Sequence, residues 1–349
     1  MRKSKEIKPT IKGRLIIDDD IARAKLLHLM RMFRDAVEMA HYYLRQGIDP
    51  CEARRRLTRF LSNSWYANSA IKRARLYQEQ PYLRLKKPQL FSVGSKYKDE
   101  KGNRNIRLVS TSKVLIKIPH ADGKQEWIEA RMKFNSKYLP IVKELITAGH
   151  GYGATISLKE KRKKWRFYIH LHIPLELYIK HMKKEAKTKI AHYVAGFDFN
   201  PDRVCMVIID QRGIIRDVKN EYFSEVTSHG FPKEKSKTIR REAIAKLVKY
   251  AREHGVKYYV IEKLSKPKPK GSKKAKRKQS KMALREFTQQ MEVLVPKVDG
   301  TLIKVNPAYS SVSARIIAED LGLNVHTASA YIIALRSIKR YATTQKVIT

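Results

Sequence analysis

AHYVAGFDF at residues 191–199 and VKYYVIE at residues 256–262 are the stretches that decide the fold. Each has the composition of a buried β-strand, and each carries one carboxylate near its end, Asp198 and Glu262. Burying a polar group without a partner costs roughly 2–7 kcal/mol. A salt bridge to Lys or Arg would satisfy either acid alone, whereas the two together favour a shared divalent cation.

The elements between and after these stretches predict an α/β domain. Two more strands and a helix separate Asp198 from Glu262, which gives the order β-β-β-α-β of an RNase H-like fold. Because the first and fourth strands of such a sheet are neighbours, the two carboxylates should converge on Mg²⁺ or Mn²⁺ and support two-metal phosphodiester hydrolysis. The sequence segments are RVCMVIID (203–210), GIIRDV (213–218), KTIRREAIAKLVKYAREHG (237–255), a later strand TLIKVN (301–306) and helices near 312–321 and 326–341.

The first half of the chain predicts a different domain. A strand at 8–17 is followed by helices at 21–45 and 51–77, and hydrophobic alternation with period two then runs from 107 to 173, interrupted by a helix near 138–148. Strands on both sides of a helical segment predict a small β-barrel with a helical domain inserted at about 20–80. We place a polar linker at 178–191, a first domain at 1–180 and a second at 191–349.

The charge of the chain indicates a polyanionic partner. It has 75 Lys and Arg against 33 Asp and Glu, a formal net charge of +42, and phosphate backbones would neutralise that excess. We expect contacts from Arg54 and Arg55, which otherwise form a solvated helix face, and from the basic segment 266–281, which includes Lys273, Lys274 and Arg277.

An anionic membrane would be the competing partner. No apolar run near 20 residues and no signal-peptide core follow Met1, so we expect a soluble, intracellular, cytoplasmic and nucleoid-associated protein with no membrane contact. The two cysteines, Cys51 and Cys205, exclude a disulfide framework and a cysteine-built zinc finger. We interpret both as packing residues.

At these residues the sequence resembles the TnpB (insertion-sequence OrfB) family of transposon-encoded RNA-guided nucleases, relatives of the type V CRISPR effectors. The resemblance covers most of the chain and rests on four segments in the family's order: GFDFN (196–200), VIEKL (260–264), KVNPAYSS (304–311) and HTASAYIIALR (326–336). It implies a RuvC-type nuclease domain behind a wedge-like barrel with a helical insert. It also implies Mg²⁺, a guide RNA and a double-stranded DNA target.

Carried over by residue, the resemblance makes Asp198 and Glu262 the first two metal ligands. Tyr309 is a loop residue near this predicted site, and we expect it to contact substrate. The third acidic position aligns with His326, and Ser329 replaces the Asp of the related pattern His-x-x-Asp-Ala-Tyr. A neutral imidazole can bind metal or accept a proton, or it can serve only as a polar contact at the helix start. Asp320 is an alternative third acid. The family's zinc ribbon is absent here, so no zinc is predicted.

Three functions remain open on the sequence. The first is an RNA-guided DNA endonuclease of the TnpB type, with Asp198, Glu262 and His326 as catalytic residues. The second is a catalytically weakened or inactive RNA-guided DNA-binding regulator, motivated by His326 and Ser329. The third is a generic basic nucleic-acid-binding protein, to which the charge alone points equally well.

Overall fold

The computed structural model describes residues 7–95, 97, 100–161, 164–183, 192–263, 284–307 and 310–345. The chain divides into two compact units, Met1–His181 and Met182–Thr349. The predicted basic segment 266–281 and Tyr309 lie outside the described residues. Across the part of the chain that the structure describes, no helix combines the length and apolar character needed to cross a bilayer.

Unit 1 is built on one antiparallel sheet of seven strands in the order β2-β6-β7-β1-β5-β4-β3. The first strand lies at its centre, paired with β5 and β7, and its alternating burial shows that one face of the strand packs against the core. The strands are β1 (Thr10–Ile16), β2 (Gln89–Ser92), β3 (Ile106–Leu108), β4 (Lys113–Pro119), β5 (Gln125–Lys133), β6 (Gly153–Lys161) and β7 (Lys164–His172).

Side chains, rather than a strand ladder, connect the two outer strands of this sheet. The Asn103 amide donates to the carbonyl oxygens of Ser92, Val93 and Tyr152 at 3.0–3.3 Å. The Tyr152 hydroxyl donates to the carbonyl of Ile106 and accepts from the amide of Leu108. Pairing recorded among the described residues gives an open strand order, so a closed barrel remains a prediction.

Three helices lie between β1 and β2: α1 (Asp20–Arg45), α2 (Pro50–Leu61) and α3 (Ser64–Ala74), followed by a 3-10 turn η1 (Arg75–Tyr77). The helical stretch predicted for 51–77 is confirmed, and it divides into α2, α3 and η1 with a break at Ser62 and Asn63. Ser62 adopts a left-handed conformation with φ of 48°, and the Asn63 side chain caps a new helix by accepting from Trp65 and Tyr66. Unit 1 also contains η3 (Ser136–Tyr138), α4 (Leu139–Thr147) and α5 (Leu175–Met182), which begins in this unit and ends at the boundary with unit 2.

Unit 2 is built on a mixed sheet in the order β10-β9-β8-β11-β12. The first three strands are antiparallel, and β11 is parallel to both β8 and β12. This is the strand order of an RNase H-like sheet, and the predicted adjacency of its first and fourth strands is confirmed. The strands are β8 (Tyr193–Phe199), β9 (Arg203–Ile209), β10 (Ile215–Tyr222), β11 (Val256–Glu262) and β12 (Thr301–Val305).

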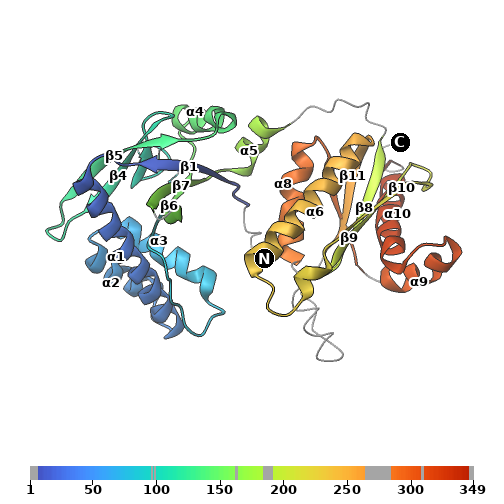
Figure 1. Ribbon diagram of the computed structural model, residues 1–349, viewed down its shortest axis with the longest axis horizontal. Helices are drawn as coiled ribbons and strands as arrows, with labels where there is room; N and C mark the ends of the chain where they lie inside the picture. The colour runs from blue at the N-terminus through green and yellow to red at the C-terminus, as the bar shows by residue number, and fades with distance from the viewer. Residues whose placement is uncertain are drawn as a thin grey trace. The chain divides into compact units, whose positions relative to one another are not determined.

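Helices cover both faces of this sheet (Figure 1). One face packs against α6 (Lys233–Glu253) and α8 (Leu284–Lys297), and the other against α10 (Val325–Gln345). A 3-10 turn η4 (Ser224–Thr227) precedes α6, and α9 (Ser310–Asp320) packs on α10. The α8 helix was not among the predicted elements.

The α10 helix approaches the sheet very closely at Gly196. A Cβ atom built on Gly196 would lie 2.1 Å from the carbonyl oxygen of Ala330 and 2.6 Å from the amide nitrogen of Ala334. Only glycine allows this distance between strand β8 and helix α10. The packing fixes the position of α10 relative to the end of β8.

Candidate active site

Asp198 and Glu262 lie on neighbouring parallel strands, β8 and β11. Ile261 is the register partner of Phe197, so Glu262 falls beside Asp198 along the sheet. Phe197 and Ile261 both belong to the core formed with α6 and α8. Because side chains alternate along a strand, Asp198 and Glu262 leave the sheet on the opposite face, the one that α10 covers.

His326 reaches this place from the first turn of α10. Its Nδ1 atom lies 3.3 Å from Oδ2 of Asp198. The Asp198 side chain is 16% exposed and the His326 side chain 42% exposed, so the contact is sheltered on the acid side and open to solvent on the imidazole side. The structure therefore brings His326 to Asp198 and places Glu262 on the adjacent strand.

Asn200 also contacts the site and was missed by the sequence analysis. Its Nδ2 donates to Oδ2 of Asp198 at 2.6 Å. The signal available in the sequence was an amide two residues after the acid, at the end of β8 where the chain turns. Cys205 is the register partner of Asp198 on β9, and burial, together with the charge of Asp198, raises the pKa of its thiol to about 11.

The donor chemistry suits a divalent cation, although the described ranges contain no group of three His, Cys, Asp or Glu residues arranged to hold one. Two carboxylates supply the hard oxygen ligands that Mg²⁺ and Mn²⁺ prefer, and an imidazole adds a donor without charge. Ser329, which stands where the related pattern has Asp, is buried in α10, and Asp320 is exposed at the end of α9.

The structure describes some of the residues that were predicted to contact nucleic acid. Arg54 and Arg55 are both exposed on α2; Arg55 pairs with Glu52 at 2.9 Å, whereas Arg54 has no ion pair among the residues described. Lys273, Lys274 and Arg277 lie outside the described residues.

The prediction that Cys51 is a packing residue is wrong, because it is exposed at the start of α2; Cys205 is buried.

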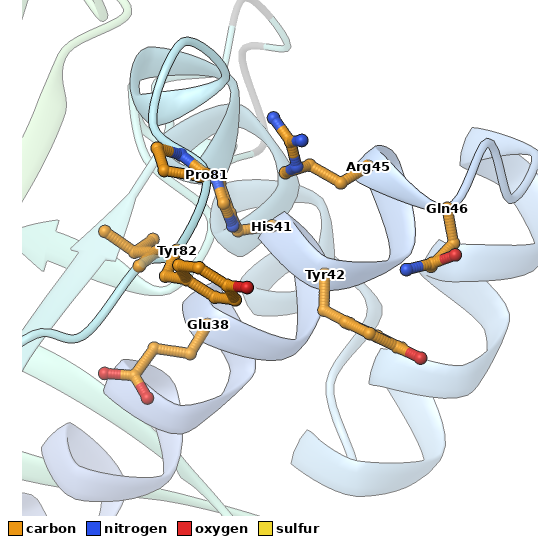
Figure 2. A pocket seen from close by; sticks show the side chains of 8 residues that line it. Glu38, His41, Tyr42, Arg45, Gln46, Pro81 and Tyr82 are labelled. Carbon is orange, nitrogen blue, oxygen red and sulfur yellow. The ribbon is translucent and has the colours of Figure 1, made fainter.

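A cavity of about 350 Å³ on the helical part of unit 1 was also missed (Figure 2). His41 and Glu38 of α1 fix the segment that covers it: His41 Nε2 lies 3.1 Å from the carbonyls of Tyr77 and Gln80, and Glu38 accepts from the amide of Leu85. The signal available in the sequence was the spacing of Glu38, His41 and Arg45, three and four residues apart, which puts these polar side chains on one face of α1. Lining residues are Glu38, His41, Tyr42, Arg45, Gln46, Pro81, Tyr82 and Leu83.

Aromatic rings and cations also meet on the sheet of unit 1. The Lys12 ammonium lies 4.0 Å from the ring centroid of Tyr168, and Arg107 and Lys117 lie 4.9 and 4.7 Å from that of Trp127. Such pairs combine charge with a flat surface on which a base can stack.

Comparisons with known proteins cover most of this chain. A family model described as the SSO2105 N-terminal domain matches residues 9–183. Protein SSO2105 of Saccharolobus solfataricus is 32% identical over 94% of this chain and 92% of its own length. The chain belongs to the SSO2105 family. A protein of Aeropyrum pernix is 27% identical to this SSO2105-family chain over 70% of each of the two.

Neither relative's name states an activity, so membership in the SSO2105 family assigns none. Two solved structures of Thermus thermophilus RuvC, one in complex with a Holliday junction substrate, match at 14% identity and a TM-score of 0.30. The match covers 41% and 44% of the SSO2105-family chain and 90% and 97% of the RuvC chains. The RNase H-like description of unit 2 rests on its strand order and pairing, not on this likeness.

Proposed function

We propose that this protein is a metal-dependent nucleic-acid endonuclease with a RuvC-type site in unit 2. One observation carries the proposal: Asp198 and Glu262 leave adjacent strands on the same sheet face, where His326 contacts Asp198. Two acids on one sheet face, at neighbouring register positions, form a pair of hard oxygen donors that a divalent cation can share, and the net charge of +42 favours a phosphate-backbone substrate.

Asp198 and Glu262 would hold the divalent cation. When bound, the cation would lower the pKa of water and neutralise charge on the phosphate. Asn200 orients the Asp198 carboxylate by donating to one of its oxygens. If His326 donates its Nδ1 proton to Asp198, its Nε2 carries the lone pair and can accept a proton from water on the exposed side of the site.

The finer proposal is that the protein uses a guide RNA to bind double-stranded DNA, as the resemblance to the TnpB family implies. The sheet of unit 1, with its barrel-like bridged edges and its inserted helices, would hold the RNA. The cation–aromatic pairs on that sheet and exposed Arg54 support this assignment. The test is to sequence the RNA that co-purifies with the protein: one dominant species supports the proposal, and a heterogeneous mixture favours a generic nucleic-acid-binding protein.

The cleavage test uses DNA matched to that RNA. Asp198→Asn and Glu262→Gln should each abolish cleavage in Mg²⁺ or Mn²⁺ and leave the Kd for DNA nearly unchanged. Glu253→Gln, which removes a partly exposed acid on α6, is the matched control and should cut normally. Cleavage that survives both substitutions would exclude this site.

The imidazole at position 326 favours a second candidate function, binding without cutting. His326 brings no negative charge to the site, and Ser329 is buried. This function predicts guide-dependent DNA binding with no products in either metal. His326→Asp would then supply the missing carboxylate and create cleavage, whereas in an active nuclease the same change would alter an existing rate.

A further inference from the structure

A second cavity, of about 270 Å³, lies in unit 2 between the first half of α6 and the start of α8. These helices cover the sheet face opposite to the one from which Asp198 projects, so this cavity is separate from the candidate active site. It is lined by Lys233, Glu234, Lys237, Arg240, Arg241, Arg285, Glu286 and Gln289.

Positive charge dominates the walls of the cavity. Five of the lining side chains are cationic and two are carboxylates. One carboxylate, Glu286, forms ion pairs with Arg240 at 3.3 Å through Oε2 and with Arg241 at 3.4 Å through Oε1, although Oε1 makes no hydrogen bond to a described residue. Lys237 and Arg285 have no acidic partner within the described part of the chain. The cavity therefore lacks the negative charge that would balance it.

Arg240 is the innermost cation. It is 8% exposed, and among the residues that the structure describes it forms an ion pair with Glu286 alone. Its Nε–H group is buried and makes no hydrogen bond to any described residue. A buried guanidinium N–H without an acceptor is unfavourable. An oxygen atom of a ligand would satisfy it once the Arg240 side chain, which lines the cavity, turns this buried group toward the ligand.

The cavity also lies at the amino end of α6. The first helical hydrogen bond runs from the amide of Ser236 to the carbonyl of Pro232, and no side chain caps the preceding amides. By contrast, Asp19, Asp49 and Asn63 cap α1, α2 and α3. Uncapped amides at the positive end of a 21-residue helix favour an anion.

We infer that this cavity binds a phosphate group. The source that we favour is the backbone of a nucleic-acid strand, and in that respect the inference rests on the proposed nucleic-acid binding. A free phosphate or nucleotide presents the same oxygens. The side chains of Arg240, Lys237 and Arg285 would donate hydrogen bonds to the phosphate oxygens. The backbone amides in the first turn of α6 would donate to the same group.

The test compares two double variants of the full chain that lose the same charge. Lys237→Gln with Arg285→Gln removes two rim cations that have no acidic partner. Lys235→Gln with Lys249→Gln removes two cations of α6 that do not line the cavity. The Kd for a nucleic-acid strand is measured over a salt series, and the melting temperature is measured in inorganic phosphate against chloride at matched ionic strength.

Loss of at least about tenfold in affinity for the strand by the rim variant, with a smaller salt slope than the control variant, supports a backbone phosphate. Selective loss of stabilisation by inorganic phosphate, with strand affinity equal in the two variants, supports free phosphate or a nucleotide. Equal behaviour of both variants in both assays overturns the inference. Absence of cleavage by the wild-type protein would sink the proposed nuclease and leave this comparison unaffected.

Discussion

Cys51 and Cys205 differ in the properties that govern thiol reactivity. Cys51 is exposed, whereas Cys205 is buried and burial raises its thiol pKa to about 11. At pH 8 we expect a thiol reagent to modify the folded protein once, at Cys51, as counted by mass spectrometry. Cys51→Ser should remain unmodified until denaturant is added. Rapid labelling of Cys205 in the folded protein would contradict its burial.

His172 makes unit 1 sensitive to acid. Its two ring nitrogens contact the hydroxyls of Thr10 and Thr155, and burial, with the charges of Arg73 and neighbours, lowers its pKa to about 4. A histidine with a depressed folded-state pKa binds fewer protons when folded. The full contribution of neutral His172 to the free energy of unfolding is therefore present above about pH 6.5. This contribution, on the order of 3 kcal/mol, is lost as the pH falls toward 4.

The measurement is the denaturant midpoint of unit 1 at pH 7.5 and at pH 4.5. All three tryptophans, Trp65, Trp127 and Trp165, lie in this unit, so their fluorescence reports on it alone. His172→Gln should reduce the difference between the two midpoints. His28→Gln, at an exposed position on α1, should leave it as in the wild type. Equal pH dependence in all three proteins would show that His172 is not the responsible group.

At the scale of elements, the contact between β8 and α10 controls the candidate site. Gly196→Ala would force α10 away from the sheet, because its Cβ would overlap the backbone of Ala330 and Ala334. We expect a loss of about 1–3 kcal/mol and faster hydrogen exchange in α10. Since His326 lies in the first turn of the same helix, the proposed cleavage should fall while affinity for nucleic acid changes little.

Gly153→Ala is the control for this substitution, because an added Cβ there meets only ordinary contacts at 3.4 Å or more. Normal exchange in α10 of the Gly196→Ala protein would show that the helix tolerates the added methyl group.

The elements of unit 2 could be predicted where local signals agree. Its first four strands are apolar runs separated by turns, and their order alone predicted that Asp198 and Glu262 are neighbours. The α8 helix could not be found, since it follows a Lys-rich stretch and contains Pro296 near its end. The contact of His326 with Asp198 spans 128 residues, and the Gly196 contact that positions α10 has no local signature.

Unit 1 was predicted less completely for a related reason. Strands β2 and β3 have four and three residues, and Asn103 and Tyr152 hold them from elsewhere in the sequence.

The exposure of Cys51 could have been predicted from the sequence. Buried residues of α2 repeat every four positions, at Ala53, Leu57 and Leu61, and Cys51 falls off that stripe.

At the scale of the whole molecule, the excess of cations should dominate affinity for nucleic acid. With a net charge of +42, we expect the protein to neutralise many phosphates and the Kd to rise by about a thousandfold or more between 50 and 200 mM salt. Fluorescence anisotropy with a labelled strand over that range provides the measurement. A change below about tenfold would mean that most of these cations do not contact the nucleic acid.

The central place of β1 in its sheet has a consequence for biosynthesis. This strand is made before its neighbours β5 and β7, which end 117 and 156 residues after its own last residue, at Lys133 and His172. A chain emerging from the ribosome can form the α1–α3 helices from local contacts, but both edges of β1 stay unpaired until those later strands appear. Non-local pairing of this kind slows folding and leaves the edges of a nascent strand open to aggregation until its partners are made.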